Sequence, residues 1–265
     1  MKAAVLMNPD AVPKFTDFQD PVATDGTAII KAKASALSHV AKSIAAGSHY
    51  SSQGEFPRIA GIDGTGFTDK GEPVYFVMPQ PPYGAMAERV PVSEFAILQV
   101  PKGVDMIKAA AIVNPGMSSV LALRRAKFEK GETVLINGAT GISGKLAVQI
   151  AKFLGAKKVI ATGRNPESLN KTKRLGADVT ISLQREKKQI IDDLEEQFNH
   201  GVDIILDYIY GESAEMLLES IYRARNAESN LRFVSIGDMA GNEIKLNADV
   251  IKSVPVSIMG SGVGG

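Results

Sequence analysis

The chain has 265 residues, a formal net charge of +1 and no cysteine. This charge gives no sign of attraction to nucleic acid or to an anionic membrane, and the lack of cysteine excludes disulfides, thiolate nucleophiles and cysteine metal ligands. The first apolar run is too short for a signal peptide, and no apolar span of about 20 residues follows it. We therefore expect a cytoplasmic protein that binds neither nucleic acid nor a membrane, and its length favours two domains.

Residues 1–115 are rich in glycine and proline and poor in helical periodicity. Short apolar runs separated by turn residues predict strands at residues 28–34, 73–77, 85–88, 88–92 and 95–101. This pattern predicts a compact β-rich domain over residues 1–115, for which a partly open barrel is one form.

From Met106 the pattern changes to a helix over 106–112, which ends at Asn114-Pro115-Gly116, and a second helix over 118–126. Strands and helices then alternate. The predicted strands cover 133–137, 158–162, 179–182, 202–206, 231–235 and 256–259, and the main helices cover 145–154, 167–175, 186–198 and 213–225. Alternation of this kind predicts a parallel sheet covered on both faces, here in a second domain over residues 116–265.

The most informative segment is a glycine-rich turn between a predicted strand and a predicted helix, Asn137-Gly138-Ala139-Thr140-Gly141-Ile142-Ser143-Gly144. Such a turn exposes backbone N–H groups, and the helix N-terminus adds partial positive charge, so the segment predicts a pyrophosphate site. Gly141 and Gly144 fit the second and third glycines of the dinucleotide fingerprint, while Ala139 stands at the first position, directly after Gly138. The alternative is a glycine turn without a ligand.

Two other nucleotide-binding patterns are excluded. A phosphate-binding P-loop would need Ser or Thr where Leu146 follows Lys145, and a glycine where Ala139 stands. A short-chain dehydrogenase would need a Tyr-x-x-x-Lys pair and a fingerprint close to the N-terminus, and the sequence has neither.

Arg164 indicates which dinucleotide is bound. It lies at the end of the second predicted strand of this domain, twenty positions after Gly144, where an NAD site normally carries Asp or Glu for the ribose 2′-hydroxyl. A guanidinium can instead pair with a 2′-phosphate. The sequence therefore favours NADP(H) as cofactor over NAD(H). An ordinary surface arginine is the alternative.

The segments described above are followed in order by 175–178 (Leu-Gly-Ala-Asp) and 202–207 (Val-Asp-Ile-Ile-Leu-Asp). With this order of segments, the chain resembles the medium-chain dehydrogenase/reductases, and within them the zinc-independent quinone oxidoreductase branch. The resemblance implies an α/β fold with a GroES-like β-rich substrate domain, a Rossmann domain with a doubly wound parallel sheet, and an active site in the cleft between them. It also implies hydride transfer from NADPH to a small-molecule electrophile, a quinone or an α,β-unsaturated carbonyl. The lack of cysteine ligands argues against zinc.

The resemblance also implies a set of cofactor contacts. Small polar residues near the nicotinamide half are represented by Ser118 and Ser119, for which helix capping is the alternative role. The loops that follow late strands are placed to approach the nicotinamide ring. The full set of expected cofactor contacts is Ser118, Ser119, Gly138, Ala139, Thr140, Gly141, Ile142, Ser143, Gly144, Arg164, Ser235, Gly237 and Gly260.

Reduction of an enone also calls for a proton donor near the developing enolate. The candidates are Tyr50, then His39, then Ser38, which stands where quinone oxidoreductases usually offer an asparagine. Each has an alternative role as a hydrogen-bonded structural group. Asp63 aligns with a carboxylate found throughout the superfamily, and we expect it to be a buried acceptor for backbone or for a basic side chain.

The superfamily normally continues for several dozen residues beyond a segment like 259–262, whereas this chain stops at Gly265. We therefore expect an abbreviated substrate domain or a shortened polypeptide, with an open active site. This end of the chain, with Ser38 and Ser43 at positions where the superfamily differs, motivates one alternative to a quinone or enone reductase, namely an NADPH-binding sensor that has lost catalysis. A further alternative is an alcohol dehydrogenase-like enzyme. Relatives pair the late strand 256–259 between two subunits, so the resemblance also implies a homodimer.

Overall fold

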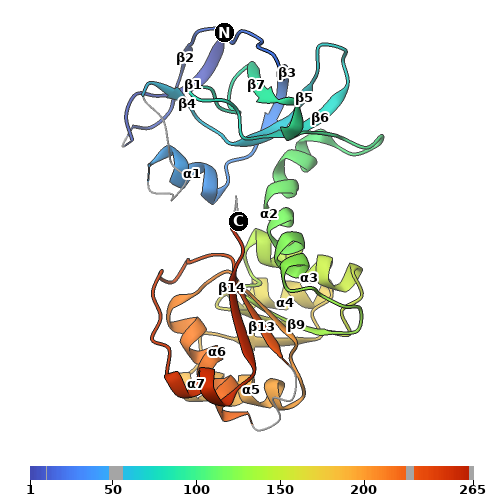
Figure 1. The fold of residues 1–265 in the computed structure, drawn as a ribbon, viewed down its shortest axis with the longest axis vertical. Helices are drawn as coiled ribbons and strands as arrows, with labels where there is room; N and C mark the ends of the chain where they lie inside the picture. Colours follow the sequence, from blue (N-terminus) through green and yellow to red (C-terminus); the bar gives the residue numbers. More distant parts are fainter. Residues whose placement is uncertain (10, 48–55, 225–229, 263–265) are drawn as a thin grey trace. The chain divides into compact units, whose positions relative to one another are not determined.

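The computed structural model describes residues 1–9, 11–47, 56–224 and 230–262. The chain divides into two compact units, Met1–Asn114 and Pro115–Gly265 (Figure 1). The first unit is built from curled antiparallel sheets and the second from a parallel sheet with helices on both faces. The predicted fold class, a β-rich unit followed by a Rossmann-type unit, is confirmed.

Two antiparallel sheets form the first unit. The three-stranded sheet has the order β2-β1-β4, with β1 (Lys2–Leu6), β2 (Lys14–Asp17) and β4 (Arg58–Ile59). The five-stranded sheet has the order β7-β3-β5-β6-β8, with β3 (Thr27–Ser35), β5 (Asp63–Phe67), β6 (Pro73–Val77), β7 (Arg89–Ser93) and β8 (Ile97–Gln99). Helix α1 (His39–Ala45) follows β3, and a 3-10 turn, η1 (Glu94–Ala96), precedes β8.

Strand β5 was missed by the sequence pattern because it reads Asp-Gly-Thr-Gly-Phe, which has weak strand propensity. Its glycines are needed because β3 passes very close. A Cβ at Gly64 would lie 2.5 Å from the Ala34 carbonyl oxygen, and a Cβ at Gly66 would lie 2.4 Å from that of Lys31. The strand predicted at 85–88 is wrong, because a strand was expected there and the structure has none. It contributes an isolated bridge, Ala3 to Ala87, and no named strand.

A single helix, α2 (Met106–Arg125), replaces the two helices predicted around Pro115. Asp105 caps its start, since Oδ1 accepts from the amides of Ile107 and Lys108 at 2.8 and 3.1 Å. Proline in a helix removes one backbone hydrogen bond. Here α2 buries apolar side chains on both sides of it, Ala110 before and Leu123 after, and this packing offsets the loss.

Helix α2 is also long and apolar enough, by length and composition, to cross a bilayer, with a mean hydropathy of 1.4. By this criterion, the expectation that the chain has no apolar span of about 20 residues is wrong. A core helix of a globular protein can meet the same criterion, so the absence of a membrane partner stays a prediction.

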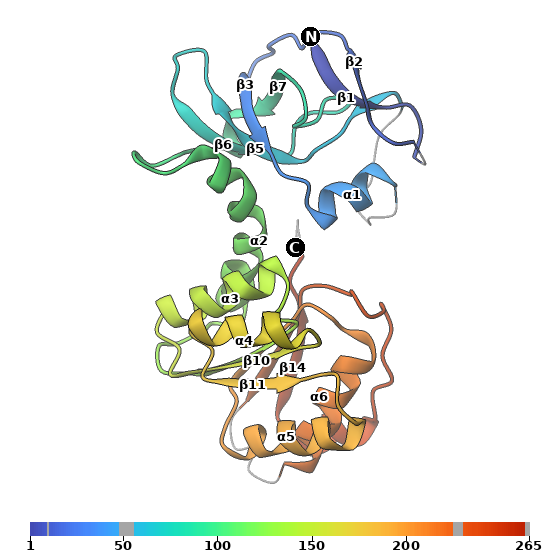
Figure 2. The same cartoon turned by 180° about the vertical axis from the view of Figure 1, so that it is seen from behind.

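Among the described residues, six parallel strands form the sheet of the second unit, in the order β11-β10-β9-β12-β13-β14. Figure 2 shows β10, β11 and β14 of this sheet. The strands are β9 (Thr133–Asn137), β10 (Lys158–Gly163), β11 (Val179–Ser182), β12 (Ile204–Asp207), β13 (Leu231–Ser235) and β14 (Val256–Gly260). The helices between them are α3 (Ile142–Phe153), α4 (Pro166–Arg174), α5 (Lys187–Asn199), α6 (Gly211–Arg223) and α7 (Ala248–Ser253).

Alternate residues of each central strand enter opposite cores. In β9, Val134 and Ile136 pack with α3 and α4, whereas Leu135 packs with α5 and α6. Side chains of successive strand residues point to opposite faces, so a strand buried on both faces is a continuous apolar run. The predicted parallel sheet with helices on both faces is therefore confirmed.

Candidate functional site

The strand order reverses between β9 and β12, because the chain builds outward from β9 to β11 and then resumes on its other side at β12. Open α/β sheets bind ligands outside the carboxyl ends of their strands at such a switch point. The loops that follow β9, β10 and β12 therefore form the candidate site, and all of them belong to the second unit.

The loop after β9, residues 138–141, is tight and well anchored. Gly138 has a φ of +90°, which favours glycine, and the Ala139 amide donates to the Thr162 carbonyl at 2.8 Å. A Cβ at Gly144 would lie 2.3 Å from the Gly138 carbonyl oxygen, so helix α3 packs directly on the loop. At Gly141 the nearest atom to such a Cβ is 3.9 Å away, and the residue is exposed.

Helix α3 begins at Ile142 without a side-chain cap, because Gly141 is the N-cap residue. Within the described residues, the amides of Ile142 and Ser143 have no acceptor. The first N–H groups of a helix lack intrahelical partners and carry the positive end of the helix dipole. This end of α3 can therefore hold an anionic group such as a pyrophosphate.

Strand β10 ends beside the same loop. Gly163 is buried, and a Cβ there would lie 2.3 Å from Cγ2 of Thr140. Arg164 follows directly and is exposed; among the described residues it makes no hydrogen bond or ion pair. Asn165 then caps α4 by accepting from the Ser168 amide at 2.8 Å. The Arg164 guanidinium is thus free to meet an anionic ligand next to the glycine loop.

The two serines of α2 lie in mid-helix, so the alternative role as helix caps is wrong. Their hydroxyls donate to the carbonyls three residues earlier, Ser118 to Pro115 at 2.7 Å and Ser119 to Gly116 at 2.8 Å. Ser119 is fully buried. Ser118 Oγ also lies 3.3 Å from the hydroxyl of Tyr208, which follows β12. Burial raises the pKa of Tyr208 to about 12, so this hydroxyl stays protonated at neutral pH.

The remaining predicted cofactor contacts lie along the same edge of the sheet. Ser235 and Gly260 are the last residues of β13 and β14. The Gly237 amide donates to the Asp207 carbonyl at 3.2 Å, and a Cβ at Gly237 would lie 2.9 Å from the Tyr208 carbonyl oxygen. The structure thus gathers these positions on the β12 side of the site and Arg164 on the β10 side.

A buried polar network at this edge was missed by the sequence interpretation. Asp207 is fully buried, and its Oδ1 accepts from Asn137 Nδ2 at 2.8 Å. Thr162 Oγ1 donates to Asn137 Oδ1 at 2.6 Å. Burial raises the pKa of Asp207, and the hydrogen bonds that it accepts offset only part of that rise. The available signal was that Asn137 and Asp207 each end a buried apolar strand, where a polar residue is unusual.

The predicted catalytic residues belong to the first unit. Ser38 is the N-cap of α1, and its hydroxyl oxygen accepts from the Ala41 amide at 3.0 Å. His39 is the first residue of that helix and is exposed. Tyr50 lies outside the described residues. The roles assigned to these three residues stay predictions.

Asp63 is fully buried, as expected, but its partner is a phenol. The Tyr75 hydroxyl donates to Asp63 Oδ2 at 2.7 Å, while Oδ1 has no partner among the described residues. Burial raises the pKa of Asp63, and hydrogen bonds from Tyr75 and Asn114 counteract this in part. The pKa of Tyr75 is also raised, by burial and by the adjacent carboxyl group.

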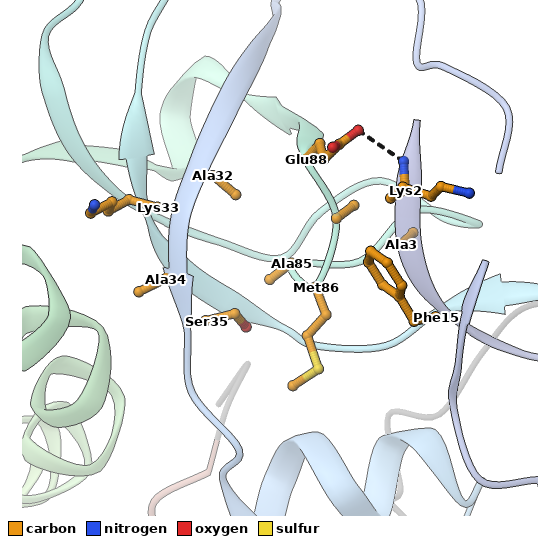
Figure 3. Close-up of a pocket in the computed structure, with 11 residues that line it drawn as sticks. Lys2, Ala3, Phe15, Ala32, Lys33, Ala34, Ser35, Ala85, Met86 and Glu88 are labelled. Carbon is orange, nitrogen blue, oxygen red and sulfur yellow. Dashed lines mark hydrogen bonds between the residues drawn. The ribbon is translucent and has the colours of Figure 1, made fainter. Parts of the chain in front are cut away.

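The first unit also carries a shallow pocket of about 350 Å³ (Figure 3). Its apolar lining is Ala3, Phe15, Ala32, Ala34, Ala85, Met86 and Ala87. Polar groups lie among them, and Glu88 accepts from the Lys2 amide at 2.8 Å. Neither Ser38 nor His39 lines this pocket, so it gives no support to their catalytic assignment.

Comparison with known proteins gives relatives for both units. A family model described as "Zinc-binding dehydrogenase" matches residues 143–265. A probable NADPH-dependent quinone reductase of Emericella nidulans is 29% identical over 95% of this chain and 81% of its own length. An NADPH-dependent alkenal/one oxidoreductase of Arabidopsis thaliana is 29% identical over 71% of this chain. The chain spans about half the length of that protein and of two archaeal NAD-dependent alcohol dehydrogenases.

Among solved structures, the quinone oxidoreductase of Thermus thermophilus superposes with a TM-score of 0.82 at 27% identity, over 98% of this chain and 80% of its own. The strand order, the glycine loop before α3 and these likenesses agree. The chain is thus similar to zinc-binding dehydrogenases over residues 143–265 and to quinone oxidoreductases over most of its length.

Proposed function

We propose that this protein is an NADPH-dependent oxidoreductase that reduces a quinone or an α,β-unsaturated carbonyl without a metal ion. The observation that carries the proposal is Arg164, an exposed guanidinium without a protein partner among the described residues, directly after β10 and next to the glycine loop. A carboxylate at this point would favour a ribose hydroxyl, whereas a guanidinium favours a 2′-phosphate.

The residues of the site fit this cofactor. The α3 N-terminus, with the amides of Ile142 and Ser143, would bind the pyrophosphate. Arg164 would bind the adenosine phosphate on the β10 side, so the nicotinamide half belongs on the β12 side, near Tyr208 and Ser118. When bound, NADPH supplies the hydride. The protein then has to place the cofactor and its electrophile correctly.

The names of two relatives support this choice of cofactor and substrate class. The fungal relative is described as an NADPH-dependent quinone reductase, and the plant relative as an NADPH-dependent alkenal/one oxidoreductase. Both substrate classes accept a hydride on an electrophilic carbon or oxygen and become enolates or phenolates. An oxidoreductase of the proposed type therefore accommodates either class with one cofactor site.

Zinc does not fit the residues that are present, although the matching family model carries zinc in its description. The chain contains no cysteine, the ligand that zinc-dependent relatives use. In the described part of the chain, no group of three His, Asp or Glu side chains is placed to hold a metal ion. We therefore propose a reaction without zinc, and we expect metal analysis of the purified protein to find less than stoichiometric zinc.

For the proton that an enone requires, we propose Tyr50, His39 and Ser38 as donors. Ser38 needs a special test because it also caps α1. Ser38→Ala removes both the cap and the hydroxyl proton, whereas Ser38→Asp keeps a capping oxygen and removes the proton. Loss of turnover in both variants would indicate a proton donor. Loss in Ser38→Ala with retention in Ser38→Asp would indicate a capping role.

We also propose a homodimer through β14, the last strand of the parallel sheet, which is paired on one side by β13. An unpaired strand edge is a template for pairing with a second chain. Sedimentation at micromolar concentration tests this proposal, and a monomer would contradict it.

The decisive experiment measures NADPH and NADH oxidation by the purified protein with a panel of quinones and enals, together with calorimetric binding of both dinucleotides. We expect NADPH to bind more tightly than NADH and to be oxidised by at least one substrate class. Tight NADPH binding without turnover on any substrate would favour a sensor, and equal affinity for the two dinucleotides would contradict the role of Arg164.

A further inference from the structure

We propose that Asp207 is a positioning residue for the dinucleotide, which fixes the glycine loop after β9 relative to the turn after β12. The inference rests on the proposed function, since it concerns the same cofactor. The hydride-transfer proposal leaves this fully buried carboxyl group without a role.

Asp207 holds the turn that follows β12. Its Oδ1 accepts from the amides of Ile209 and Tyr210 at 2.9 and 3.0 Å, in addition to Asn137 Nδ2. Its second oxygen, Oδ2, is buried and has no partner among the described residues. One carboxyl oxygen thus collects three donors, one from the end of β9 and two from the turn after β12.

The turn held in this way is strained. Tyr210 has a φ of +58° and a ψ of −153°, a region that essentially only glycine adopts. The next residue, Gly211, has a φ of +54°, and a Cβ there would lie 2.7 Å from the Ala240 carbonyl oxygen. Strain of this kind persists only where surrounding contacts enforce it, and it concentrates at ligand sites. Two of the enforcing contacts are the hydrogen bonds to Asp207.

The strained turn lies directly against the glycine loop. A Cβ at Gly138 would be 2.8 Å from Cγ1 of Ile209 and 3.4 Å from Cβ of Tyr208. The Tyr208 amide donates to the Asn137 carbonyl at 3.0 Å. A shift of the turn after β12 would therefore push on the loop that has to receive the pyrophosphate.

A second connection runs through side chains. Asn137 joins Asp207 to Thr162 on β10, because its amide nitrogen donates to Asp207 and its oxygen accepts from the Thr162 hydroxyl. Thr162 Oγ1 in turn accepts from the Gly138 amide at 3.3 Å. The carboxyl group at the end of β12 is thus linked, through neighbours on β9 and β10, to the backbone of the glycine loop itself.

The test compares Asp207→Ala with Asp203→Ala. Asp203 lies at the opposite end of the same strand region, and its Oδ2 accepts from the Thr133 amide at 2.8 Å, so it also fixes backbone with a carboxylate. The probes are NADPH and adenosine 2′-monophosphate, which carries the adenosine end without a pyrophosphate. We expect Asp207→Ala to weaken NADPH by about tenfold or more, while its affinity for adenosine 2′-monophosphate changes by less than about twofold. Asp203→Ala should leave both affinities within about twofold of the parent.

Two further variants keep the inference testable if Asp207→Ala does not fold. Thr162→Val, a change of similar shape, cuts the link from Asn137 to Gly138, and we expect it to weaken NADPH by about threefold or more. Asp207→Asn keeps an oxygen acceptor and should restore most of the NADPH affinity lost in Asp207→Ala. The inference is overturned if Thr162→Val, or a folded Asp207→Ala variant, binds NADPH within about twofold of the parent affinity. It is also overturned if Asp203→Ala loses as much NADPH affinity as Asp207→Ala. If the parent protein itself binds no NADPH, that result contradicts the proposed function, whereas the outcomes above contradict the role of Asp207 alone.

Discussion

At the amino edge of the parallel sheet, charged side chains hold the starts of the strands. Asp178 accepts from the Val159 amide and from Lys152 Nζ, each at 2.6 Å, and Arg232 pairs with Glu132. At the carboxyl edge, Asp207 is fully buried and has no cationic partner among the described residues, and the first backbone amides of α3 are left without acceptors. Ion pairs thus occupy one edge, whereas unpaired donors and a free guanidinium occupy the other.

The contrast between the two edges indicates which of them can bind an anion. Where a charged group already has a partner, as Arg232 and Lys152 do, an anionic ligand gains little, because it would have to displace that partner. Where N–H groups and a guanidinium lack partners, a ligand satisfies them at no such cost. Changes at the carboxyl edge should therefore alter cofactor affinity, and changes at the amino edge should alter stability alone.

The largest expected effect comes from adding one methyl group at Gly144. The Cβ of Gly144→Ala would lie 2.3 Å from the Gly138 carbonyl oxygen, and such overpacking costs about 2 kcal/mol or more in the free energy of unfolding. Gly141→Ala is the matched control, because its Cβ has no atom within 3.9 Å. It should keep the stability of the parent and weaken NADPH, since its methyl group occupies the pyrophosphate's approach. Urea unfolding and calorimetry measure the two effects, and equal stability of the two variants would contradict the prediction.

The next effect concerns cofactor choice. Arg164→Glu should weaken NADPH by about 1.5–3 kcal/mol, because a charge-assisted contact is replaced by repulsion, and should change NADH far less. Arg174→Glu makes the same charge change at the other end of α4, also at an exposed arginine, and should leave both affinities unchanged. A similar loss of NADPH affinity in both variants would show that the effect is one of net charge.

At the amino edge, Glu132→Gln should cost about 1 kcal/mol in the free energy of unfolding, because it removes the charge from a partly buried ion pair with Arg232. We expect NADPH affinity to stay as in the parent. A variant of normal stability and weakened cofactor binding would reverse the contrast between the two edges.

The smallest effect is a pair of opposite pH dependences. Burial acts to raise the pKa of Asp178, but hydrogen bonds from Lys152 and the Val159 amide outweigh it, so the pKa lies below the usual 3.8. The stability that Asp178 contributes is present above pH 3.8 and is lost as the pH falls through the folded-state pKa. The pKa of Asp207 is raised, so the parent instead loses stability as the pH rises above 3.8 through the folded-state pKa.

Asp178→Asn should therefore be less stable than the parent near neutral pH and approach it in acid, whereas Asp207→Asn should gain relative to the parent as the pH rises. Urea unfolding between about pH 3 and about pH 7 compares the two variants. Slopes of the same sign would contradict the assignment of opposite pKa shifts.

Much of the second unit could be predicted from the sequence because its signals are local. Strand β13 was predicted at its observed bounds, and the strands on either side of it within a few residues, although helix α7 was not predicted. A buried parallel strand is a continuous apolar run, and a helix begins after a capping residue such as Asn165. These patterns need no knowledge of the partner strand.

The failures depend on contacts between residues that are distant in sequence. Pro115 indicates a helix end locally, yet packing on both sides carries α2 through it. Strand β5 forms by pairing with β3 and β6, and its glycines are needed because β3 leaves no room for side chains at Gly64 and Gly66. Asp207 and Asn137 are 70 positions apart, and only the strand order brings them together. The site residues that the sequence could indicate lie within one local segment each, namely the glycine loop after β9 and Arg164 after β10.

The lack of room for a side chain at Gly163 has a practical consequence for coenzyme engineering. Its Cβ would fall within 2.3 Å of Thr140, whereas the next side chain projects freely into solvent. A library meant to convert the preference from the phosphorylated to the unphosphorylated coenzyme should therefore randomise residue 164 and leave its neighbour as glycine. An acidic residue introduced at position 163 instead would displace the loop at Thr140, so it could not be used to discriminate between the two coenzymes.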